Sequence, residues 1–375
     1  MDAEAKGRGV AKKKTSGGKR REKLLTVKDF ERAARQKLTK TAYDYYRSGS
    51  DSEAALRRNE RAFRRLVMWY RVLVDVSERE LSTTVLGMPV ATPILIAPTA
   101  YHKLATPDGE LATARAAARM GTIYVASTLA TTPLEDVAEA AESPKWFQLY
   151  VHKDRGFTQS LVERAEMAGY DALVVTVDTP VLGRRLRDER NGFALPTGMS
   201  MANLLALTGD DDQGSMLARY VADRHDAAFT WSDLAWLKSL SHLPVVLKGI
   251  VRVDDAVRAA DEGVAGLIVS NHGGRQLDAS PATIDALPGI AQAISSRCEV
   301  YVDGGIRWGG DVLKALALGA RAVLVGRPVL WGLAVDGEEG VVKVLSLLAD
   351  ELSRSMALAG VASVRNVERG MVVRE

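Results

Sequence analysis

The chain has 375 residues, 47% of them apolar and 26% charged, which is the balance of an ordinary globular enzyme. Its single cysteine, Cys298, excludes an internal disulfide framework and favours a reducing, cytoplasmic compartment. No apolar run approaches the ~20 residues that a membrane-spanning helix needs, and the N-terminus lacks the apolar core of a secretory signal. We therefore expect no membrane partner.

The net charge of +3 is unevenly distributed along the chain. Residues 1–23 carry nine Lys and Arg against three acidic residues, a surplus of +6 that leaves −3 for residues 24–375. We predict a disordered basic tail over residues 1–23, because so polar a segment buries too little apolar surface to fold. Residues 24–375 are then a single domain. Such a tail could contact nucleic acid or an anionic membrane, but a solvated extension without a partner is the simpler expectation.

Residues 28–70 have the pattern of helices that pack in front of a larger unit. Beyond them an internal repeat combines a helix, a glycine stop and a buried strand. Its clearest copies contain Gly169, Gly263 and Gly319, each followed by an apolar run. Before Gly263, apolar side chains recur at i, i+3, i+4 and i+7, which indicates one face of a helix with the glycine at its C-terminal cap.

Eight buried strands are predicted, over residues 94–97, 123–127, 146–150, 172–178, 245–248, 266–270, 300–303 and 322–325. Continuous apolar runs are typical of parallel strands covered on both faces, and their alternation with helices indicates an α/β fold. Eight such units favour a closed (β/α)8 TIM barrel. A doubly wound open sheet is the alternative, which is disfavoured because no Gly-x-Gly-x-x-Gly turn follows the first strand.

The stretch from about residue 179 to residue 242, after the fourth strand, is too long for one crossover. Long excursions at the catalytic end of a barrel often serve as lids, so we expect part of it to be mobile.

The motif from Ser270 to Asp278 directly follows the predicted strand 266–270. Its glycines permit a tight turn that carries an imidazole, His272, and a guanidinium, Arg275, toward the same volume. Histidine accepts a proton near neutral pH, and the planar fork of arginine matches a carboxylate. The pair indicates chemistry beside an acid group, such as oxidation of a 2-hydroxy acid. A polar turn that merely ends a strand is the alternative.

The ends of the last two predicted strands form a candidate phosphate site. Gly304 and Gly305 allow backbone N–H groups close to an anion, and Arg307 and Arg327 add positive charge at a place where (β/α)8 barrels commonly bind phosphate. A cofactor with one phosphate fits better than a dinucleotide, because no Rossmann fingerprint accompanies the site. No spacing of His or Cys indicates a metal site.

Further motifs stand at the other strand ends and before the barrel. They are Tyr43-Asp44-Tyr45-Tyr46, Ile96-Ala97-Pro98-Thr99-Ala100, Gln148-Leu149-Tyr150, Thr176-Val177-Asp178-Thr179-Pro180, Gly183-Arg184-Arg185, Lys248-Gly249, Asp303-Gly304-Gly305 and Gly326-Arg327-Pro328. With these motifs, residues 27–362 resemble the FMN-dependent 2-hydroxy acid oxidase/dehydrogenase family, which includes glycolate oxidase, lactate oxidase, mandelate dehydrogenase and the flavin domain of flavocytochrome b2. The resemblance implies FMN as cofactor, oxidation of (S)-2-hydroxy acids to 2-oxo acids, O2 or another electron acceptor, and a homotetramer.

The resemblance also implies roles for single residues. In catalysis, His272 is the base, Asp178 orients it, and Lys248 lies near N1 and O2 of the flavin. The residues implied in substrate binding are Tyr45, Tyr150, Arg185, Arg275 and Leu129. Those implied in cofactor binding are Pro98, Thr99, Ala100, Ser127, Gln148, Thr176, Lys248, Ser270, Asp303, Gly304, Gly305, Arg307, Gly326 and Arg327.

Two departures within the family bear on substrate and acceptor. Leu129 stands where glycolate oxidase has a tryptophan over the substrate side chain, so we expect lactate, medium-chain or mandelate-like acids to react better than glycolate. Ala100 resembles the oxidases, whereas mandelate dehydrogenase has glycine there, and this favours O2 as acceptor with H2O2 as product.

Other readings of the sequence stay open. The chain could be a dehydrogenase or monooxygenase of the same family, or a non-catalytic barrel that binds anions or nucleic acid. A different FMN barrel, such as a nucleotide dehydrogenase, is disfavoured because Cys298 precedes a strand and lies outside any catalytic loop. We expect His152, His225 and His242 on the surface, and we expect His102 to line the cavity.

Overall fold

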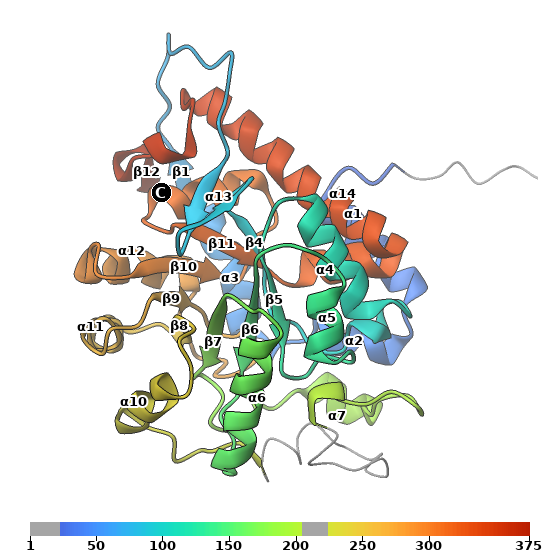
Figure 1. The fold of residues 1–375 in the computed structure, drawn as a ribbon. Helices are drawn as coiled ribbons and strands as arrows, with labels where there is room; N and C mark the ends of the chain where they lie inside the picture. The colour runs from blue at the N-terminus through green and yellow to red at the C-terminus, as the bar shows by residue number, and fades with distance from the viewer. Residues whose placement is uncertain (1–22, 205–223) are drawn as a thin grey trace, which may run out of the picture.

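Eight parallel strands form a closed barrel at the centre of the molecule, in the order β10-β11-β4-β5-β6-β7-β8-β9 (Figure 1). The structure is a computed structural model that describes residues 23–204 and 224–375. The strands are β4 (Ile94–Ile96), β5 (Tyr124–Ser127), β6 (Lys145–Leu149), β7 (Ala172–Thr176), β8 (Val245–Ile250), β9 (Gly266–Val269), β10 (Glu299–Asp303) and β11 (Ala322–Val325). The (β/α)8 barrel predicted from the repeat is confirmed, and the open-sheet alternative is wrong.

Helices follow the barrel strands and cover their outer faces. They are α4 (Gly109–Arg119), α5 (Leu134–Glu139), α6 (Arg155–Met167), α10 (Trp231–Ser239), α11 (Val253–Asp261), α12 (Thr283–Ile294), α13 (Gly309–Ala317) and α14 (Arg327–Ala359). The last of these contains a kink at Asp336 and Gly337, where the backbone leaves helical geometry. Gly263 follows α11 with a φ of +68°, at the C-terminal position that the repeat predicts.

Inward-facing apolar side chains fill the barrel, and a short hairpin closes the end of the barrel at which the strands begin. The hairpin joins β2 (Thr83–Val85) to β3 (Met88–Val90), and its Val85 and Val90 pack with Leu95, Trp146, Tyr301 and other inward residues. Glu299 on β10 accepts a hydrogen bond from the backbone N–H of Leu86 at 3.1 Å. Because the strands are parallel, the N-terminal ends that this hairpin covers lie opposite the C-terminal ends that carry the polar motifs.

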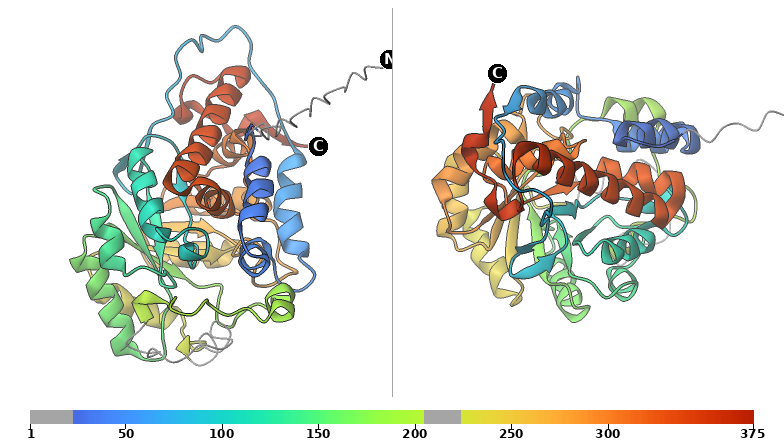
Figure 2. Two further views of the ribbon diagram at one scale, coloured as in Figure 1. Left: turned by 90° about the vertical axis from the view of Figure 1, so that its right-hand side faces the viewer. Right: turned by 90° about the horizontal axis from the view of Figure 1, so that it is seen from above.

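Three N-terminal helices precede the barrel, as predicted for residues 28–70. They are α1 (Val27–Lys37), α2 (Lys40–Arg47) and α3 (Ala54–Arg64), followed by β1 (Leu66–Met68), which pairs with the C-terminal β12 (Val372–Arg374). A capping box between Thr26 and Asp29 starts α1. Both α1 and α2 pack against α14, and Figure 2 shows these N-terminal helices (blue) beside that long helix (red).

A side chain from the loop after β9, more than 200 residues further along the sequence, caps α3. The Asp278 carboxylate accepts hydrogen bonds from the backbone N–H of Ala55 at 2.9 Å and from the N–H and hydroxyl of Ser52 at 3.1 and 2.6 Å. Gly274, four residues earlier, has a φ of +74°, and a Cβ there would overlap the backbone of Leu56. The loop that follows β9 is therefore held against the N-terminal helices.

The excursion after β7 contains α7 (Leu186–Asn191), the 3₁₀ turn η2 (Ala202–Leu204) and α10. Its residues 205–223, and residues 1–22 of the basic N-terminal segment, lie outside the described residues. The mobile lid and the disordered tail therefore stay predictions. Within residues 23–204 and 224–375 no helix is long and apolar enough to cross a membrane.

Candidate active site

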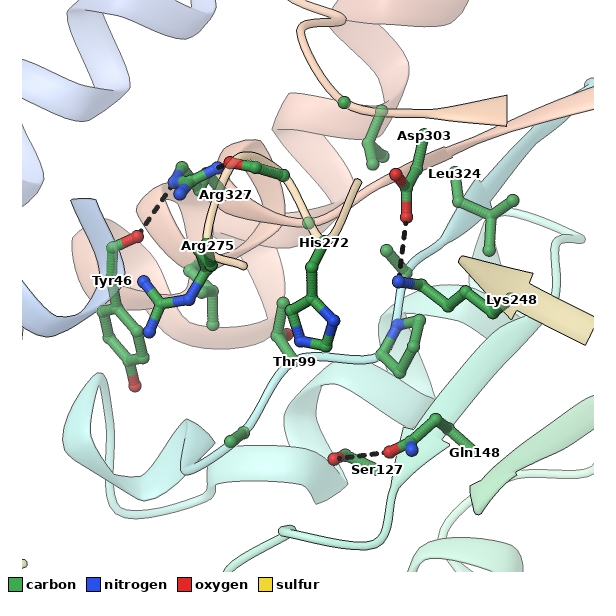
Figure 3. A pocket seen from close by; sticks show the side chains of 18 of the residues that line it. Tyr46, Thr99, Ser127, Gln148, Lys248, His272, Arg275, Asp303, Leu324 and Arg327 are labelled. Atoms are coloured by element: carbon green, nitrogen blue, oxygen red, sulfur yellow. Dashed lines mark hydrogen bonds and ion pairs between the residues drawn. The ribbon is translucent and has the colours of Figure 1, made fainter. Parts of the chain in front are cut away.

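A cavity at the C-terminal ends of the barrel strands gathers nearly all of the predicted site residues (Figure 3). It encloses about 1100 Å³, part of it open to solvent. Of the residues assigned from the sequence, only Asp178 and Ser270 do not line it, and both contact a residue that does. The prediction that polar strand ends converge is confirmed in geometry.

The loop after β9 aims the imidazole of His272 at this cavity. His272 has a φ of +58°, an uncommon conformation for a residue with a side chain, and its backbone N–H donates to Ser270 Oγ at 3.0 Å. Its Nδ1 lies 2.9 Å from Asp178 Oδ1 and 3.4 Å from Thr179 Oγ1. The carboxylate therefore holds the ring at Nδ1 and leaves Nε2 as the nitrogen for exchanging a proton with a ligand.

Opposing effects set the ionisation of this pair. Burial lowers the pKa of His272, the Asp178 carboxylate raises it, and the Lys248 ammonium lowers it, so the net shift is downward. Burial raises the pKa of Asp178, but the histidine, the lysine and the hydroxyl of Thr179 together bring it below the ordinary value. Near neutral pH the pair is thus a carboxylate beside a neutral imidazole, which can take up a proton.

A charged lysine lies deep in the same cavity. Lys248 Nζ donates to Ser270 Oγ at 3.0 Å and lies 3.3 Å from Asp303 Oδ2. Burial lowers the pKa of Lys248, but Asp303 and Asp178 outweigh this effect and raise it above the ordinary value. The ammonium therefore stays charged and can stabilise negative charge on a ring placed against it.

Three neighbouring strand ends present a row of hydrogen-bonding side chains. Gln148 Oε1 accepts from Ser127 Oγ at 3.1 Å (Figure 3), and Gln148 Nε2 donates to Thr176 Oγ1 at 3.0 Å. All three side chains are buried and line the cavity. Buried amides and hydroxyls in a row suit the edge of a planar heterocycle with alternating donors and acceptors.

The opposite side of the cavity is built for an anion. Among the described residues the guanidinium of Arg327 donates only to backbone carbonyls, those of Tyr46 at 2.9 Å, Ser48 at 2.8 Å and Gly273 at 3.0 Å. Burial lowers the pKa of Arg327 well below its usual range, and the nearby Arg275 and Arg307 lower it further. A buried guanidinium at the N-terminal residue of α14, paired with no carboxylate in the part of the chain that the structure describes, matches a phosphate group.

Gly304 and Gly305 allow the chain to reach this anion site and to pack under α3 at the same time. Their φ angles are +92° and +89°, and a Cβ on Gly305 would overlap the backbone of Asn59. Arg307 pairs with Glu60 of α3 at 2.9 Å. Beside them, Asp303 Oδ1 is buried without a hydrogen-bond partner among the described residues, which leaves one acceptor for a ligand hydroxyl.

Two further arginines, Arg185 and Arg275, line the cavity. Arg275 donates to the carbonyls of Tyr45 at 2.6 Å and Ser48 at 2.9 Å, and its guanidinium lies 5.0 Å from the centroid of the Tyr45 ring. Burial, together with Arg275, lowers the pKa of Arg185 to about 10. Arg185 Nε has no hydrogen-bond partner within residues 23–204 and 224–375. These guanidinium groups are therefore available to a small carboxylate.

Phe193, which supports the cavity-lining Tyr45 from behind, is a residue that sequence reasoning missed. It follows α7 and stacks on Tyr45, with ring centroids 4.3 Å apart. On the other side Tyr150 and Leu129 line the cavity, and burial raises the pKa of the Tyr150 phenol, which keeps it a hydrogen-bond donor. No motif points to Phe193, because a lone phenylalanine in a long loop resembles any other apolar contact.

The histidine expectations are partly wrong. His152 and His225 are buried, not exposed: they pair across an antiparallel bridge, and burial lowers their pKa values to about 3 and about 4. His225 also stacks on Tyr150 at 4.5 Å between centroids. His242 is exposed, as predicted. His102 does not line the cavity but lies behind Thr99, which does.

The residues present fit FMN. The arginine side of the cavity suits the phosphate. The free Oδ1 of Asp303, which has no partner among the described residues, suits a hydroxyl of the sugar-alcohol chain, and the row of Ser127, Gln148 and Thr176 suits the edge of the flavin ring. Within residues 23–204 and 224–375 no group of three or more His, Cys, Asp or Glu side chains is arranged to hold a metal ion.

Fold and site together define a class, the (β/α)8-barrel flavoproteins. A family model described as FMN-dependent dehydrogenase matches residues 34–374, and the chain belongs to that family. The resemblance inferred from the sequence is confirmed, and FMN is the cofactor.

Named relatives agree with this assignment. An L-lactate oxidase from Nostoc sp. is 53% identical over 352 residues, covering 92% of this chain and 96% of the relative. The human 2-hydroxyacid oxidase 1 is 49% identical, covering 93% and 96%. The crystal structure of a mandelate oxidase with (S)-4-hydroxymandelic acid superposes with a TM-score of 0.90 at 45% identity, covering 94% of this chain and 99% of that one. The oxidase reading of the chain is supported.

Replacing Asp178 with Asn tests the contact with His272. The carboxylate raises the pKa of His272, so its loss lowers that pKa and moves the acidic limb of the kcat/KM profile to lower pH. The plateau falls by about 100-fold or more, because the protonated ring loses its stabilising charge. Asp254→Asn, at an exposed residue that pairs with the exposed Arg252, leaves both features unchanged. An unmoved limb with an intact plateau would refute the assignment.

Replacing Arg307 with Met tests the anion side. Loss of one charged donor raises the dissociation constant for FMN by about 10–100-fold and leaves that for riboflavin, which has no phosphate, unchanged. Fluorescence titration of flavin-free protein measures both constants. Arg297→Met, on the exposed pair with Asp261, is the matched control. Equal weakening of both flavins would mean that Arg307 has only a structural role.

Proposed function

We propose that this protein oxidises (S)-2-hydroxy acids to 2-oxo acids and passes the electrons to O2, which becomes H2O2. One observation carries the proposal. The His272–Asp178 pair faces the same cavity as Arg185 and Arg275, two guanidinium groups that form no ion pair with an acidic side chain among the described residues. A base beside two guanidinium groups that can hold a carboxylate is what a 2-hydroxy acid requires.

The chemistry follows from these positions. Oxidation of the substrate removes two protons, one from the hydroxyl and one from Cα, and two electrons, and FMN supplies the two-electron acceptor. His272 takes up a proton from the substrate, whichever bond breaks first. Asp178 stabilises the resulting imidazolium of His272. The positive charge of Lys248 favours negative charge on a flavin ring bound beside it. Arg185 and Arg275 hold the carboxylate so that Cα faces the cofactor.

The substrate that we propose is larger than glycolate. Leu129 is buried and lines the cavity, and its branched side chain occupies less volume than an indole. Space at this wall suits the methyl group of lactate or a longer or aromatic side chain. The relatives are named for lactate, glycolate and mandelate, so they support the substrate class but do not select one member.

O2 is the acceptor that Ala100 and the oxidase names of the relatives favour. A dehydrogenase with another acceptor, or a monooxygenase with another product, is the second candidate, and the product formed in air separates the three. The chain also exposes an apolar segment, residues 67–74, that includes Trp69, Tyr70 and Leu73. We propose that a second copy of the chain covers it in a homotetramer.

Anaerobic bleaching tests the catalytic proposal. The purified protein is yellow, L-lactate or (S)-mandelate bleaches it without air, and air restores the colour with one H2O2 per 2-oxo acid. His272→Gln keeps its flavin but is reduced at least about 100-fold more slowly, because the base is lost. His242→Gln, at an exposed histidine, is the control. A colourless protein that binds DNA would support the non-catalytic reading, and unchanged reduction of His272→Gln would overturn the role of His272.

A substrate panel tests the pocket. We expect kcat/KM for lactate, 2-hydroxyoctanoate and mandelate to exceed that for glycolate. In Leu129→Trp the ratio of kcat/KM for glycolate to kcat/KM for the larger acids rises by at least about tenfold, because the indole fills the space that the larger side chains use. Leu358→Trp, at an exposed helix position, keeps the order. Glycolate exceeding the others tenfold in the unaltered enzyme would refute the larger pocket.

A further inference from the structure

His102 is fully buried behind the cofactor cavity, and both of its ring nitrogens are engaged. It opens the 3₁₀ turn η1 (His102–Leu104) just after β4. Its Nε2 lies 2.6 Å from the hydroxyl oxygen of Thr99, and its Nδ1 lies 2.9 Å from that of Thr113 on α4. Thr99 lines the cavity and is labelled in Figure 3. No step described above uses His102.

The hydrogen-bond directions follow from the tautomer of His102. Thr113 Oγ1 lies 3.5 Å from the carbonyl of Gly109, to which its hydroxyl can donate while its oxygen accepts from His102 Nδ1–H. A neutral imidazole that donates through one nitrogen accepts through the other. In the tautomer with the proton on Nδ1, Nε2 accepts the hydroxyl proton of Thr99. This contact turns the O–H of Thr99 toward His102 and leaves the lone pairs of its oxygen for the cavity.

A buried carboxylate next to His102 stabilises the arrangement. Glu110 has no exposed surface and accepts hydrogen bonds from the backbone N–H of His102 at 3.0 Å, from the N–H and hydroxyl of Thr131 at 2.8 Å each, and from the hydroxyl of Thr132 at 2.9 Å. These donors are all neutral. Glu110 thus fixes the turn that carries His102 to the loop that follows Leu129, and it keeps a negative charge behind Thr99.

We propose that His102 carries its proton on Nδ1 and is a positioning residue that makes the Thr99 hydroxyl a hydrogen-bond acceptor toward FMN, which stabilises the reduced cofactor. Reduced flavin carries an N–H that oxidised flavin lacks. An acceptor whose own proton is already engaged interacts better with a donor than with a lone pair. The inference rests on FMN binding and is independent of which acid is oxidised, so its failure leaves the proposed function untouched.

The two-electron midpoint potential of bound FMN tests the inference without any substrate. His102→Leu and Thr99→Val each lower the preference for reduced over oxidised FMN by about tenfold, which is about 30 mV for a two-electron couple. The double variant shows the same shift as either single variant, because both remove one interaction. His102→Gln, whose amide oxygen can accept from Thr99, restores most of the potential. His242→Leu, the exposed histidine, does not change it.

Three outcomes overturn the inference. The first is an unchanged potential in His102→Leu, whatever happens to its melting temperature. The second is a pair of shifts that add in the double variant, because independent effects do not pass through one contact. The third is weaker binding of oxidised FMN with no change in potential, which a merely structural histidine produces. If His102→Leu does not fold, Thr113→Val is used, and its potential falls in the same direction because Nδ1 loses its acceptor.

Discussion

Uncompensated positive charge is the constraint around which this molecule is organised. Arg185, Arg275 and Arg327 lie in one cavity and form no ion pair with an acidic side chain among the described residues, and Arg327 donates only to backbone carbonyls. Burying guanidinium groups in this way costs stability unless anions complete the site. FMN phosphate and a substrate carboxylate are two such anions. The cavity is thus incomplete as protein alone, and its ligands supply the missing half of its electrostatics.

The N-terminal helices are part of this cavity as much as the barrel is. Carbonyl groups of Tyr45, Tyr46 and Ser48, at the end of α2, accept hydrogen bonds from Arg275 and Arg327. In return Asp278, three residues after Arg275, caps α3. The barrel therefore supplies side chains, while α2 and α3 fix their directions. Conformations of low intrinsic stability, such as the positive φ of His272, persist because contacts from both sides determine them.

Much of this could be predicted from the sequence, and the reasons for the rest are physical. Continuous apolar strands identify themselves locally, so the eight barrel strands and the polar residues at their ends were predictable. His272 and Arg275 share one short turn, and their convergence followed. The burial of His152 and His225 was missed, because it comes from a bridge between segments 73 residues apart. Three other contacts between distant segments were missed for the same reason: Asp278 with α3, Phe193 with Tyr45, and the β2–β3 hairpin with the N-terminal end of the barrel. The roles of the site residues, the single domain, the tetramer and the cytoplasmic location stay predictions.

The tether between α2 and the two arginines limits how such a protein can be rearranged. A gene fusion that replaced the segment before residue 66 with an unrelated module would preserve all eight strands, yet it would remove the carbonyls that orient Arg275 and Arg327. Recombination that preserves the site must then keep the N-terminal helices and the barrel together. New modules can be added before that block, but the boundary at which recombination preserves the catalyst lies upstream of α1, not at the first barrel strand.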